Sequence, residues 1–87
     1  MPSYTVAVKP SAAKEIAVLA SPILQRVMEA IERLGGDPRP AGCKKLHGPP
    51  GDLWRIRIGD YRVVYSINDN ALKVDVLRVR HRSQVYE

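Results

Sequence analysis

Three arginines in the second half of the chain have the residue type and spacing to hold a phosphate. Arg55 and Arg57 precede the dipeptide Gly59-Asp60, and Arg62 follows it. If the dipeptide forms a two-residue hairpin loop, strand pairing puts all three side chains on one face of a sheet, with Arg57 opposite Arg62. Guanidinium groups bind phosphate in a bidentate way and stay charged at any cellular pH. Like charges placed opposite each other destabilise a sheet, so the cluster indicates either an anionic ligand or ordinary solvated side chains.

A second basic cluster lies near the carboxyl end and consists of Arg78, Arg80, His81 and Arg82. Residues 44–87 hold nine of the fourteen Lys and Arg residues but five of the nine Asp and Glu residues, so they carry most of the net charge of +5. Two basic clusters on one small sheet favour an RNA-like backbone as the ligand.

Two further basic residues, Lys44 and Lys45, fall in a segment rich in Gly and Pro that is predicted to be a loop. They are candidates for contacts with RNA or for solvated loop charge.

The composition is that of one folded domain, which we expect to span residues 1–87. Hydrophobic residues make up 45% and charged residues 26%, which excludes a disordered chain. No apolar run reaches the roughly 18 residues of a membrane span, and the amino terminus lacks a secretory signal pattern, so we expect a cytoplasmic protein with no membrane partner. The single Cys43 has no second thiol for a disulfide or a zinc site. Neither a metal nor another cofactor is expected.

The first half of the chain is predicted to form one strand and two helices. Alternating side chains indicate a strand over residues 3–9. Ser11 is the predicted N-cap of the first helix, and Ser21, followed by proline, is the predicted N-cap of the second. Gly35 and Gly36 are predicted to end the second helix through a left-handed turn.

The second half is predicted to form three strands that pair in sequence: Leu53 to Ile58, Tyr61 to Ile67 and Leu72 to Val79. The element order is therefore β-α-α-β-β-β. It predicts an α+β fold in which a helical hairpin packs on one face of a small, mainly antiparallel sheet.

Strand register divides the side chains between the two faces of this sheet. Trp54 and Tyr65 fall on the helix-facing side and are predicted to be core residues. If Ile67 pairs with Leu72, the same counting places Arg80 on the helix-facing side as well. Arg80 can therefore join the arginine cluster only if a bulge or a strand end precedes it.

The chain resembles a known family over nearly its whole length. The matching motifs are Asp37-Pro38, Lys45-Leu46-x-Gly48, the stretch from Leu53 to Tyr65, Val79-x-His81-Arg82 and Val85-Tyr86. Together they resemble the RelE toxins of bacterial toxin–antitoxin systems, within the RelE and ParE superfamily. The His-Arg ending is more similar to RelE than to ParE.

The resemblance implies an endoribonuclease that enters the ribosomal A site and cuts the mRNA held there, by attack of the ribose 2′-hydroxyl and without a metal. It also implies that the basic catalytic positions of the family fall on Arg55, Arg57, Arg62 and Arg80, and its catalytic tyrosine on Tyr86. The implied partners are an acidic antitoxin protein, the ribosome with its mRNA, and operator DNA for the antitoxin-bound complex.

This chemistry needs a base for the 2′-hydroxyl, positive charge at the phosphate and an acid for the departing 5′-oxygen. Arg57, Arg62 and Arg80 fit the second task. The best-studied members of the family carry lysines where this chain has Arg55 and Arg57, and arginine is a poor proton shuttle.

Two residues are left as candidates for proton transfer. His81 has an ordinary pKa of about 6.5, and Tyr86 one of about 10 that neighbouring arginines would have to lower. We expect Tyr86 to be the base and His81 to act as the acid or to position RNA, the alternative being an ordinary surface histidine. Arg78, Arg82, Lys44 and Lys45 are expected to contact RNA.

Two alternative functions stay open. ParE proteins inhibit DNA gyrase on the same fold without cutting anything, and a degenerate toxin could serve with its antitoxin as a DNA-binding co-repressor. Breaks inside translated codons would identify the RelE function, whereas intact messages with damaged chromosomes would identify the ParE function.

Overall fold

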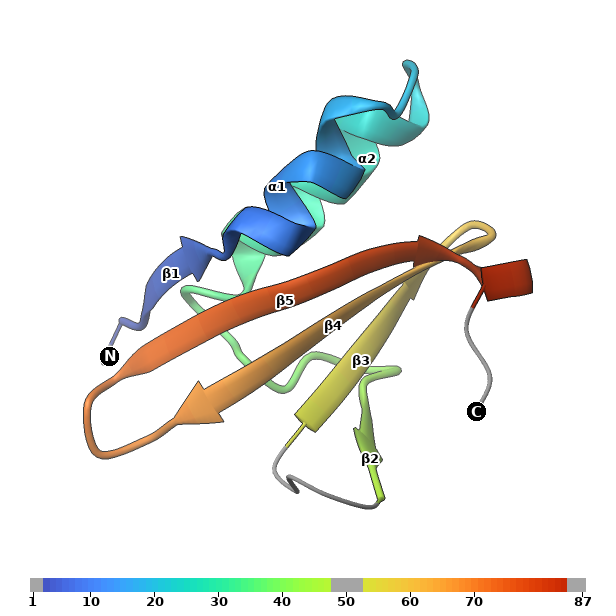
Figure 1. Ribbon diagram of the computed structural model, residues 1–87. Helices are drawn as coiled ribbons and strands as arrows, with labels where there is room; N and C mark the ends of the chain where they lie inside the picture. Colours follow the sequence, from blue (N-terminus) through green and yellow to red (C-terminus); the bar gives the residue numbers. More distant parts are fainter. Residues whose placement is uncertain (1–2, 48–52, 85–87) are drawn as a thin grey trace.

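The computed structural model describes residues 3–47 and 53–84, which form one five-stranded sheet with two helices on one side (Figure 1). The elements are β1 (Thr5–Val8), α1 (Pro10–Ala17), α2 (Ile23–Arg33), β2 (Lys44–Leu46), β3 (Leu53–Ile58), β4 (Tyr61–Asn68), β5 (Lys73–His81) and the 3-10 turn η1 (Arg82–Gln84). The strand order is β1-β5-β4-β3-β2, with β1 parallel to β5 and every other pair antiparallel. The predicted α+β class and helical hairpin are confirmed, and β2 is an additional strand.

The hydrophobic core fills the space between the helices and the sheet. Its buried members are Ala12 from α1, Val27 and Ile31 from α2, Leu34, and the sheet residues Ile56, Ile58, Val63, Tyr65, Val74, Val76 and Val79. Tyr65 is fully buried as predicted, while Trp54 is half-buried and packs against the core. Each fully buried Val, Leu or Ile contributes about 1.5–3 kcal/mol. Among the described residues, neither helix is long and apolar enough to cross a membrane.

Both helices begin at residues other than those predicted. α1 starts at Pro10, whose missing N–H costs nothing in a first turn. Ser11 is therefore not the N-cap; its hydroxyl donates to the carbonyl of Leu77 in β5 at 2.8 Å. α2 starts after Pro22 rather than directly after Ser21.

Gly35 ends α2 for a different reason from the one predicted. Neither Gly35 nor Gly36 adopts a positive φ; the described glycines that do are Gly42 and Gly59. The carbonyl of Gly35 accepts the backbone N–H of Tyr4 at 2.7 Å, and a Cβ on Gly35 would lie 3.1 Å from the Tyr4 carbonyl oxygen. Glycine is needed here because the chain leaving α2 passes close to β1.

The first hairpin has the predicted register. Ile58 pairs with Tyr61 and Arg57 pairs with Arg62, so Gly59 and Asp60 form the two-residue loop. Gly59 has φ of 59°, a value that glycine adopts without strain.

The second hairpin differs from the prediction at its turn. Ile67 pairs with Val74 rather than with Leu72, because the turn extends through Leu72, which has φ of 53°. The pairings counted from Ile67 and Leu72 are therefore off by two residues near the turn, and Tyr61 pairs with His81 rather than with Arg78, an offset of three.

A bulge in β5 places Arg80 on the same face of the sheet as Arg57 and Arg62. Tyr65 pairs with Val76 and the preceding Val64 pairs with Arg78, which leaves Leu77 as an extra residue in β5. Beyond this point the two strands pair regularly again. Of the two alternatives that the sequence left open before Arg80, a bulge or a strand end, the structure shows the bulge. The bulge moves the side chains that follow it to the opposite faces.

The buried Tyr65 hydroxyl should contribute measurably to stability. It donates to the Pro38 carbonyl at 2.8 Å, and burial raises the pKa of this phenol well above its ordinary value. We expect Tyr65→Phe to lower the free energy of unfolding in urea by about 1–3 kcal/mol, because the Pro38 carbonyl loses its donor.

The matched control is Tyr61→Phe, since the Tyr61 hydroxyl has no hydrogen bond within residues 3–47 and 53–84. Its effect should stay within about 0.5 kcal/mol. Equal losses in the two variants would contradict the assignment.

Candidate nucleic-acid interface

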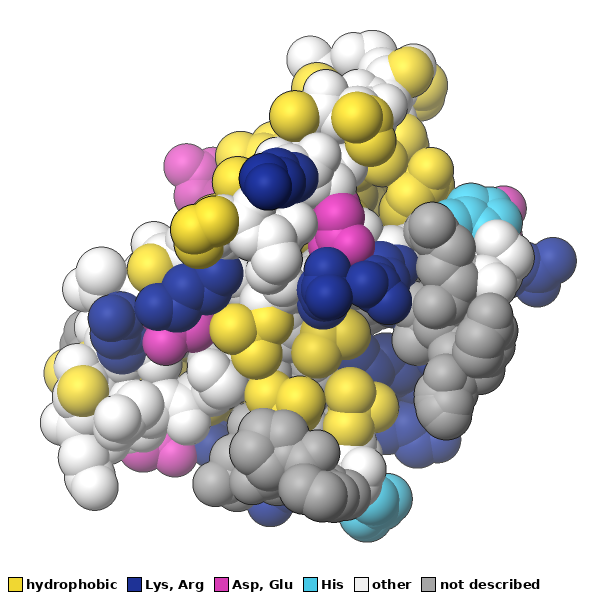
Figure 2. Space-filling view, in the orientation of Figure 1, with side chains coloured by type: hydrophobic (Ala, Val, Ile, Leu, Met, Phe, Trp, Pro, Cys, Tyr) yellow, Lys and Arg dark blue, Asp and Glu magenta, His cyan; other side chains and the backbone are white. Residues whose placement is uncertain are grey.

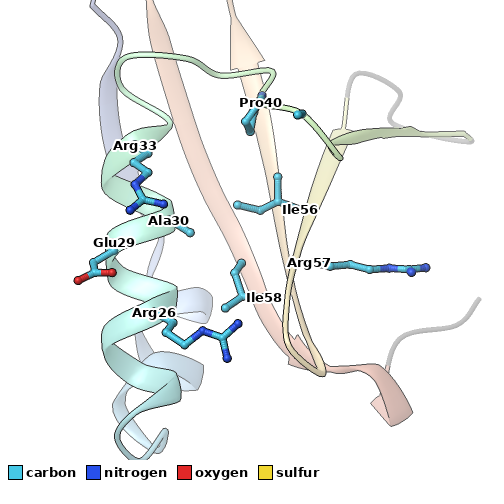
Figure 3. A pocket seen from close by; sticks show the side chains of 9 residues that line it. Arg26, Glu29, Ala30, Arg33, Pro40, Ile56, Arg57 and Ile58 are labelled. Carbon is cyan, nitrogen blue, oxygen red and sulfur yellow. The ribbon is translucent and has the colours of Figure 1, made fainter.

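A row of three arginines crosses the middle of the sheet on neighbouring strands. Arg57 in β3 pairs with Arg62 in β4, and Arg62 pairs in turn with Arg80 in β5. Strand pairing places their side chains on the same face. Figure 3 shows that Ile56 and Ile58 point from β3 toward α2, whereas Arg57 points the other way. We call these three residues the arginine row.

Two members of the arginine row have no carboxylate partner among residues 3–47 and 53–84. Within the described part of the chain, no carboxylate forms an ion pair with Arg57 or Arg62. A hollow of about 180 Å³ opens beside them at the β3–β4 loop, lined by Arg57, Gly59, Asp60, Tyr61, Arg62 and Arg82. Arginines held side by side next to an open hollow can bind a phosphate group.

The third member is paired with a carboxylate of α1. The Nε of Arg80 donates to Glu15 Oε2 at 2.9 Å, and Nη1 of Arg78 approaches the same oxygen at 3.3 Å. In the space-filling view, basic side chains gather over β5 with acidic side chains among them (Figure 2). The positive charge at Arg78 and Arg80 is therefore reduced, but it is not removed, because two guanidinium groups share one carboxylate.

Arg55 lies on the predicted face but not at the surface. Arg55 is only 8% exposed, and its Nη1 donates to the Gly42 carbonyl at 3.3 Å. Burial lowers the pKa of Arg55 below its ordinary value, and the nearby charges of Arg57 and Arg62 lower it further. The segment that leads into β2 covers this side chain, so the structure does not bring Arg55 to the surface with the arginine row.

The end of β5 places His81 beside β4. His81 pairs with Tyr61, and the two rings meet edge to face with centroids 5.3 Å apart. Strand alternation places this pair on the face opposite the arginine row, so the sheet does not bring His81 and the row together. The Nδ1 of His81 accepts the backbone N–H of Ser83 at 3.2 Å and lies 2.9 Å from the Ser83 hydroxyl. Because Nδ1 acts as an acceptor, the neutral ring carries its proton on Nε2. Tyr86, the other candidate for proton transfer, lies outside the described residues.

The remaining basic candidates lie around the arginine row. Arg82 is exposed, its backbone N–H donates to the Asp60 carbonyl at 2.7 Å, and its Nε lies 3.9 Å from Asp60 Oδ1. Lys44 and Lys45 were predicted to lie in a loop, but they lie on β2. Lys44 pairs with Arg55 and shares the face of the row, whereas Lys45 pairs with Trp54 and lies on the other face. The structure therefore brings Arg82 and Lys44 to the side of the row but not Lys45.

Trp54 is flanked by cations. The Arg39 guanidinium lies 5.1 Å and the Lys45 ammonium 5.9 Å from the centre of its ring. Arg39 also forms a salt bridge with Asp69 at 2.9 Å, and Asp69 accepts the Tyr4 hydroxyl at 2.6 Å. Hydrogen bonds from Arg39 and Tyr4 lower the pKa of the Asp69 carboxyl. This network holds the Trp54 side of the sheet and supports a structural role for that residue.

Sequence reasoning missed Glu15. The only signal in the sequence is that Glu15 lies four residues after Ser11, a spacing that puts two helical side chains on one face. The strand that this face meets is set by how α1 packs, which no local pattern contains. Among the described residues, no three His, Cys, Asp or Glu side chains come together as a possible metal site.

The repulsion within the arginine row should be measurable as lost stability. We expect Arg57→Gln to raise the free energy of unfolding by a few tenths of a kcal/mol, because it removes a like charge directly opposite Arg62. This gain in stability should shrink in about 0.5 M salt, because the Debye length falls there to roughly 4 Å and the repulsion is screened.

Arg33→Gln is the matched control because Arg33 is exposed at the last turn of α2 and has no ion pair in the described residues. It removes the same charge but also a favourable interaction with the helix end, so stability should fall slightly. A greater loss in Arg57→Gln than in Arg33→Gln would show that the row is not under repulsion.

Comparison with known proteins places these features in a family. The sequence model described as "ParE toxin of type II toxin-antitoxin system, parDE" matches residues 6–86. Toxin RelG of Mycobacterium tuberculosis (strain ATCC 25618 / H37Rv) is 34% identical over 84 residues, which cover 95% of each chain. Toxin RelE of the same organism is 33% identical over 84 residues, which cover 95% of this chain and 86% of the relative.

Solved structures show the same fold. The toxin–antitoxin complex RelBE2 from Mycobacterium tuberculosis matches with a TM-score of 0.80 and 32% identity, covering 92% of this chain and 99% of that chain. The archaeal RelE–RelB complex from Pyrococcus horikoshii OT3 matches with a TM-score of 0.82 and 30% identity, covering 95% of this chain and 99% of that chain.

Proposed function

The chain belongs to the RelE/ParE superfamily and is a type II toxin–antitoxin toxin of the RelE family, and from this premise we propose that it is a ribosome-dependent endoribonuclease. In this proposal the toxin enters the ribosomal A site and cuts the mRNA held there. The ribose 2′-hydroxyl attacks the adjacent phosphate, the bond to the 5′-oxygen breaks, and no metal takes part. Translation stops because the message is cut.

The observation that carries the proposal is the arginine row, two of whose members have no carboxylate partner among the described residues. A phosphate under attack gains negative charge on its non-bridging oxygens. Arg57 and Arg62, paired across two strands and free of carboxylates within the described residues, offer fixed positive charge at such a site. Arg80 extends the row toward the end of β5. The rigid sheet holds this charge in place before the reaction begins, which favours electrostatic stabilisation of the transition state.

The burial of Arg55 supports a narrower assignment than the resemblance implied. Its guanidinium donates to Gly42 beneath the segment that leads into β2. We therefore propose that Arg57, Arg62 and Arg80 contact the reacting phosphate. Arg55 would act on them indirectly, through its charge and by holding the segment around Gly42.

Proton transfer is proposed for His81 and Tyr86, because the arginine row itself contains no group whose pKa can lie near neutrality. Tyr86 would take the proton of the 2′-hydroxyl once neighbouring arginines stabilise its phenolate. His81 follows Arg80 in β5 and leaves the strand on the other face, so it would reach the phosphate around the end of the strand. Its Nε2 proton is directed away from the Ser83 contacts made by Nδ1. It would supply the proton for the departing 5′-oxygen or position the RNA.

The cations around the row would bind the rest of the message. Arg82 is exposed beside the hollow. Arg78 precedes Arg80 by two residues in β5, and Lys44 and Lys45 lie on β2. Contacts of this kind go to the phosphate backbone, are independent of sequence and weaken as salt is raised.

An antitoxin protein is the expected partner that holds the toxin in check. The solved relatives from Mycobacterium tuberculosis and Pyrococcus horikoshii are toxin–antitoxin complexes. We propose that this chain likewise binds an acidic antitoxin, that the complex binds operator DNA, and that the toxin acts in the cytoplasm, where ribosomes are. Gyrase inhibition in the manner of ParE is not favoured, because the curated relatives are toxins named RelG and RelE.

Cleavage should be tested on ribosomes programmed with a defined message. We expect new mRNA ends inside the codon at the A site, and no cleavage of the same message without ribosomes. A message with a single 2′-deoxyribose at the cut position should resist, because the attacking hydroxyl is missing. An intact message on ribosomes, together with broken chromosomes after induction in cells, would overturn the proposal in favour of gyrase inhibition.

The role of the arginine row should be tested with Arg62→Gln. Loss of one preorganised donor to the transition state should lower the single-turnover cleavage rate roughly 10²–10³-fold. Arg33→Gln makes the same charge change on α2, on the helix-covered side of the sheet from which Arg57 points away (Figure 3), and should cleave at close to the wild-type rate. Equal rates for the two variants would show that the row does not act on the phosphate.

The proton-transfer roles should be tested with Tyr86→Phe and His81→Ala. Loss of a general base or acid should slow cleavage roughly 10²–10⁴-fold. Full activity in both variants would exclude these two residues from the chemistry, without bearing on the arginine row.

A further inference from the structure

One edge of β5 changes partner halfway along the strand. β1 pairs with β5 only from Lys73 to Val76. From Leu77 onward, α1 lies along this edge in place of a strand, directly after β1 in the chain (Figure 1). Backbone groups on the edge of a strand need hydrogen-bond partners when they are covered. Side chains of α1 supply them here.

Ser11 and Glu15, one helical turn apart, contact this edge at the bulge and just after it. The Ser11 hydroxyl donates to the carbonyl of Leu77, the extra residue, at 2.8 Å. Glu15 Oε1 accepts the backbone N–H of Val79 at 2.8 Å. These two contacts attach the bulged part of β5 to α1 and so support the register that sets Arg80 opposite Arg62.

The second oxygen of Glu15 holds the arginine side chain itself. Oε2 accepts Nε of Arg80 at 2.9 Å, and Nη1 of Arg78 lies 3.3 Å from the same oxygen. One carboxylate thus contacts the backbone of β5 and the two side chains that flank that contact. The side chain of Glu15 is only 23% exposed, so water screens this contact less than it would a surface ion pair.

We propose that Glu15 is a positioning residue that fixes the guanidinium of Arg80 for the phosphate, an inference that rests on the proposed function. The contact engages only Nε. The terminal nitrogens of Arg80 have no hydrogen bond or ion pair in the described residues, and its side chain is 35% exposed. These terminal nitrogens stay available to a ligand while the contact between Nε and Glu15 holds the side chain in place. A fixed donor loses less freedom when the transition state forms than a mobile one does.

A purely neutralising role for Glu15 predicts the opposite result. If the carboxylate only reduced positive charge, its removal would strengthen RNA binding and leave the rate of the bound complex unchanged or higher. If the carboxylate positions Arg80, its removal lowers the rate of the bound complex even though the site becomes more positive. The positioning role therefore predicts a fall in kcat, whereas the neutralising role predicts no change or a rise.

Glu15→Gln is the discriminating variant. Its amide oxygen can still accept the Val79 N–H, so the edge of β5 keeps its partner, but the neutral amide no longer holds Arg80 as an ion pair. In the ribosome assay we expect kcat to fall roughly 10–100-fold, the size of effect that misplacement of a catalytic group produces. KM should stay equal or fall, because one negative charge is lost from an RNA-binding surface.

Glu32→Gln is the matched control. Glu32 is exposed on α2, its side chain has no partner in the described residues, and the change in net charge is the same. It should leave kcat within about twofold of the wild type. A fall in kcat of the same size in both variants would assign the effect to net charge and would overturn the role of Glu15.

The variant Arg80→Met tests whether Glu15 acts through Arg80. Methionine has a similar length but neither a charge nor an N–H donor, so the contact to Glu15 is absent in this background. Adding Glu15→Gln to Arg80→Met should then change kcat by less than about twofold. An undiminished 10–100-fold loss in the double variant would show that Glu15 acts on the reaction by another route.

A measurement without catalysis separates this inference from the proposed function. In NMR spectra, the Arg80 Nε–H signal should exchange slowly with water in the wild type, and the exchange should become at least tenfold faster in Glu15→Gln, while the Val79 amide stays protected. If the wild type does not cleave mRNA, the proposed function fails and the role of Glu15 in it fails too. If the wild type cleaves but the Arg80 signal and kcat are unchanged in Glu15→Gln, only the role of Glu15 fails.

Discussion

The pairing of β4 with β5 is the constraint on which the site depends. With a regular ladder from the turn at residues 69–72 onward, Arg80 would point into the core beneath the helices, where an unpaired guanidinium is far too costly to bury. The one extra residue, Leu77, turns Arg80 to the outer face and lets Val79 take the core position instead. The same residue therefore decides both the packing of the core and the composition of the charged face.

This constraint explains why α1 takes part in the site although none of its residues belongs to the arginine row. A bulge leaves backbone groups out of the ladder, and these groups must be satisfied by something other than a strand. α1 follows β1 directly and covers the edge where β1 ends, so its Ser11 and Glu15 reach the bulged segment. The position of Arg80 is thus set by contacts on both sides of β5, with β4 on one side and α1 on the other.

Charge on the outer face is tolerated because the other face is well packed. Tyr65, Val63 and Val76 are fully buried against the helices. Their burial stabilises the sheet by several kcal/mol, whereas like charges directly opposite each other cost only tenths. The protein can therefore keep Arg57 and Arg62 side by side without carboxylates among the described residues. Arg55 shows the limit of this tolerance, since its guanidinium is covered and donates to the Gly42 carbonyl.

The sequence predicted the parts of this arrangement that depend on short-range patterns. Alternation and the Gly59-Asp60 loop determined the register of β3 with β4, and so the pairing of Arg57 with Arg62. The same counting showed that Arg80 needed a bulge or a strand end before it, but not where the bulge lies, because any of several residues could have been left out of the ladder. β2 was missed because three residues are too few to show alternation. The cover over Arg55 and the contact of Glu15 depend on how separate elements pack, which the pattern within one element does not record.

The fold also separates the two kinds of chemistry that the proposed reaction requires. Fixed positive charge lies on the rigid sheet, where backbone pairing holds Arg57 and Arg62 in a preorganised arrangement. Proton transfer requires groups whose pKa can lie near neutrality, and arginine cannot provide this at any position of the row. In the proposed reaction it is therefore left to His81, the last residue of β5, and to residues after it. The arginine row by itself could bind a phosphodiester but has no group to move a proton, so the proposed reaction needs these residues as well as the row.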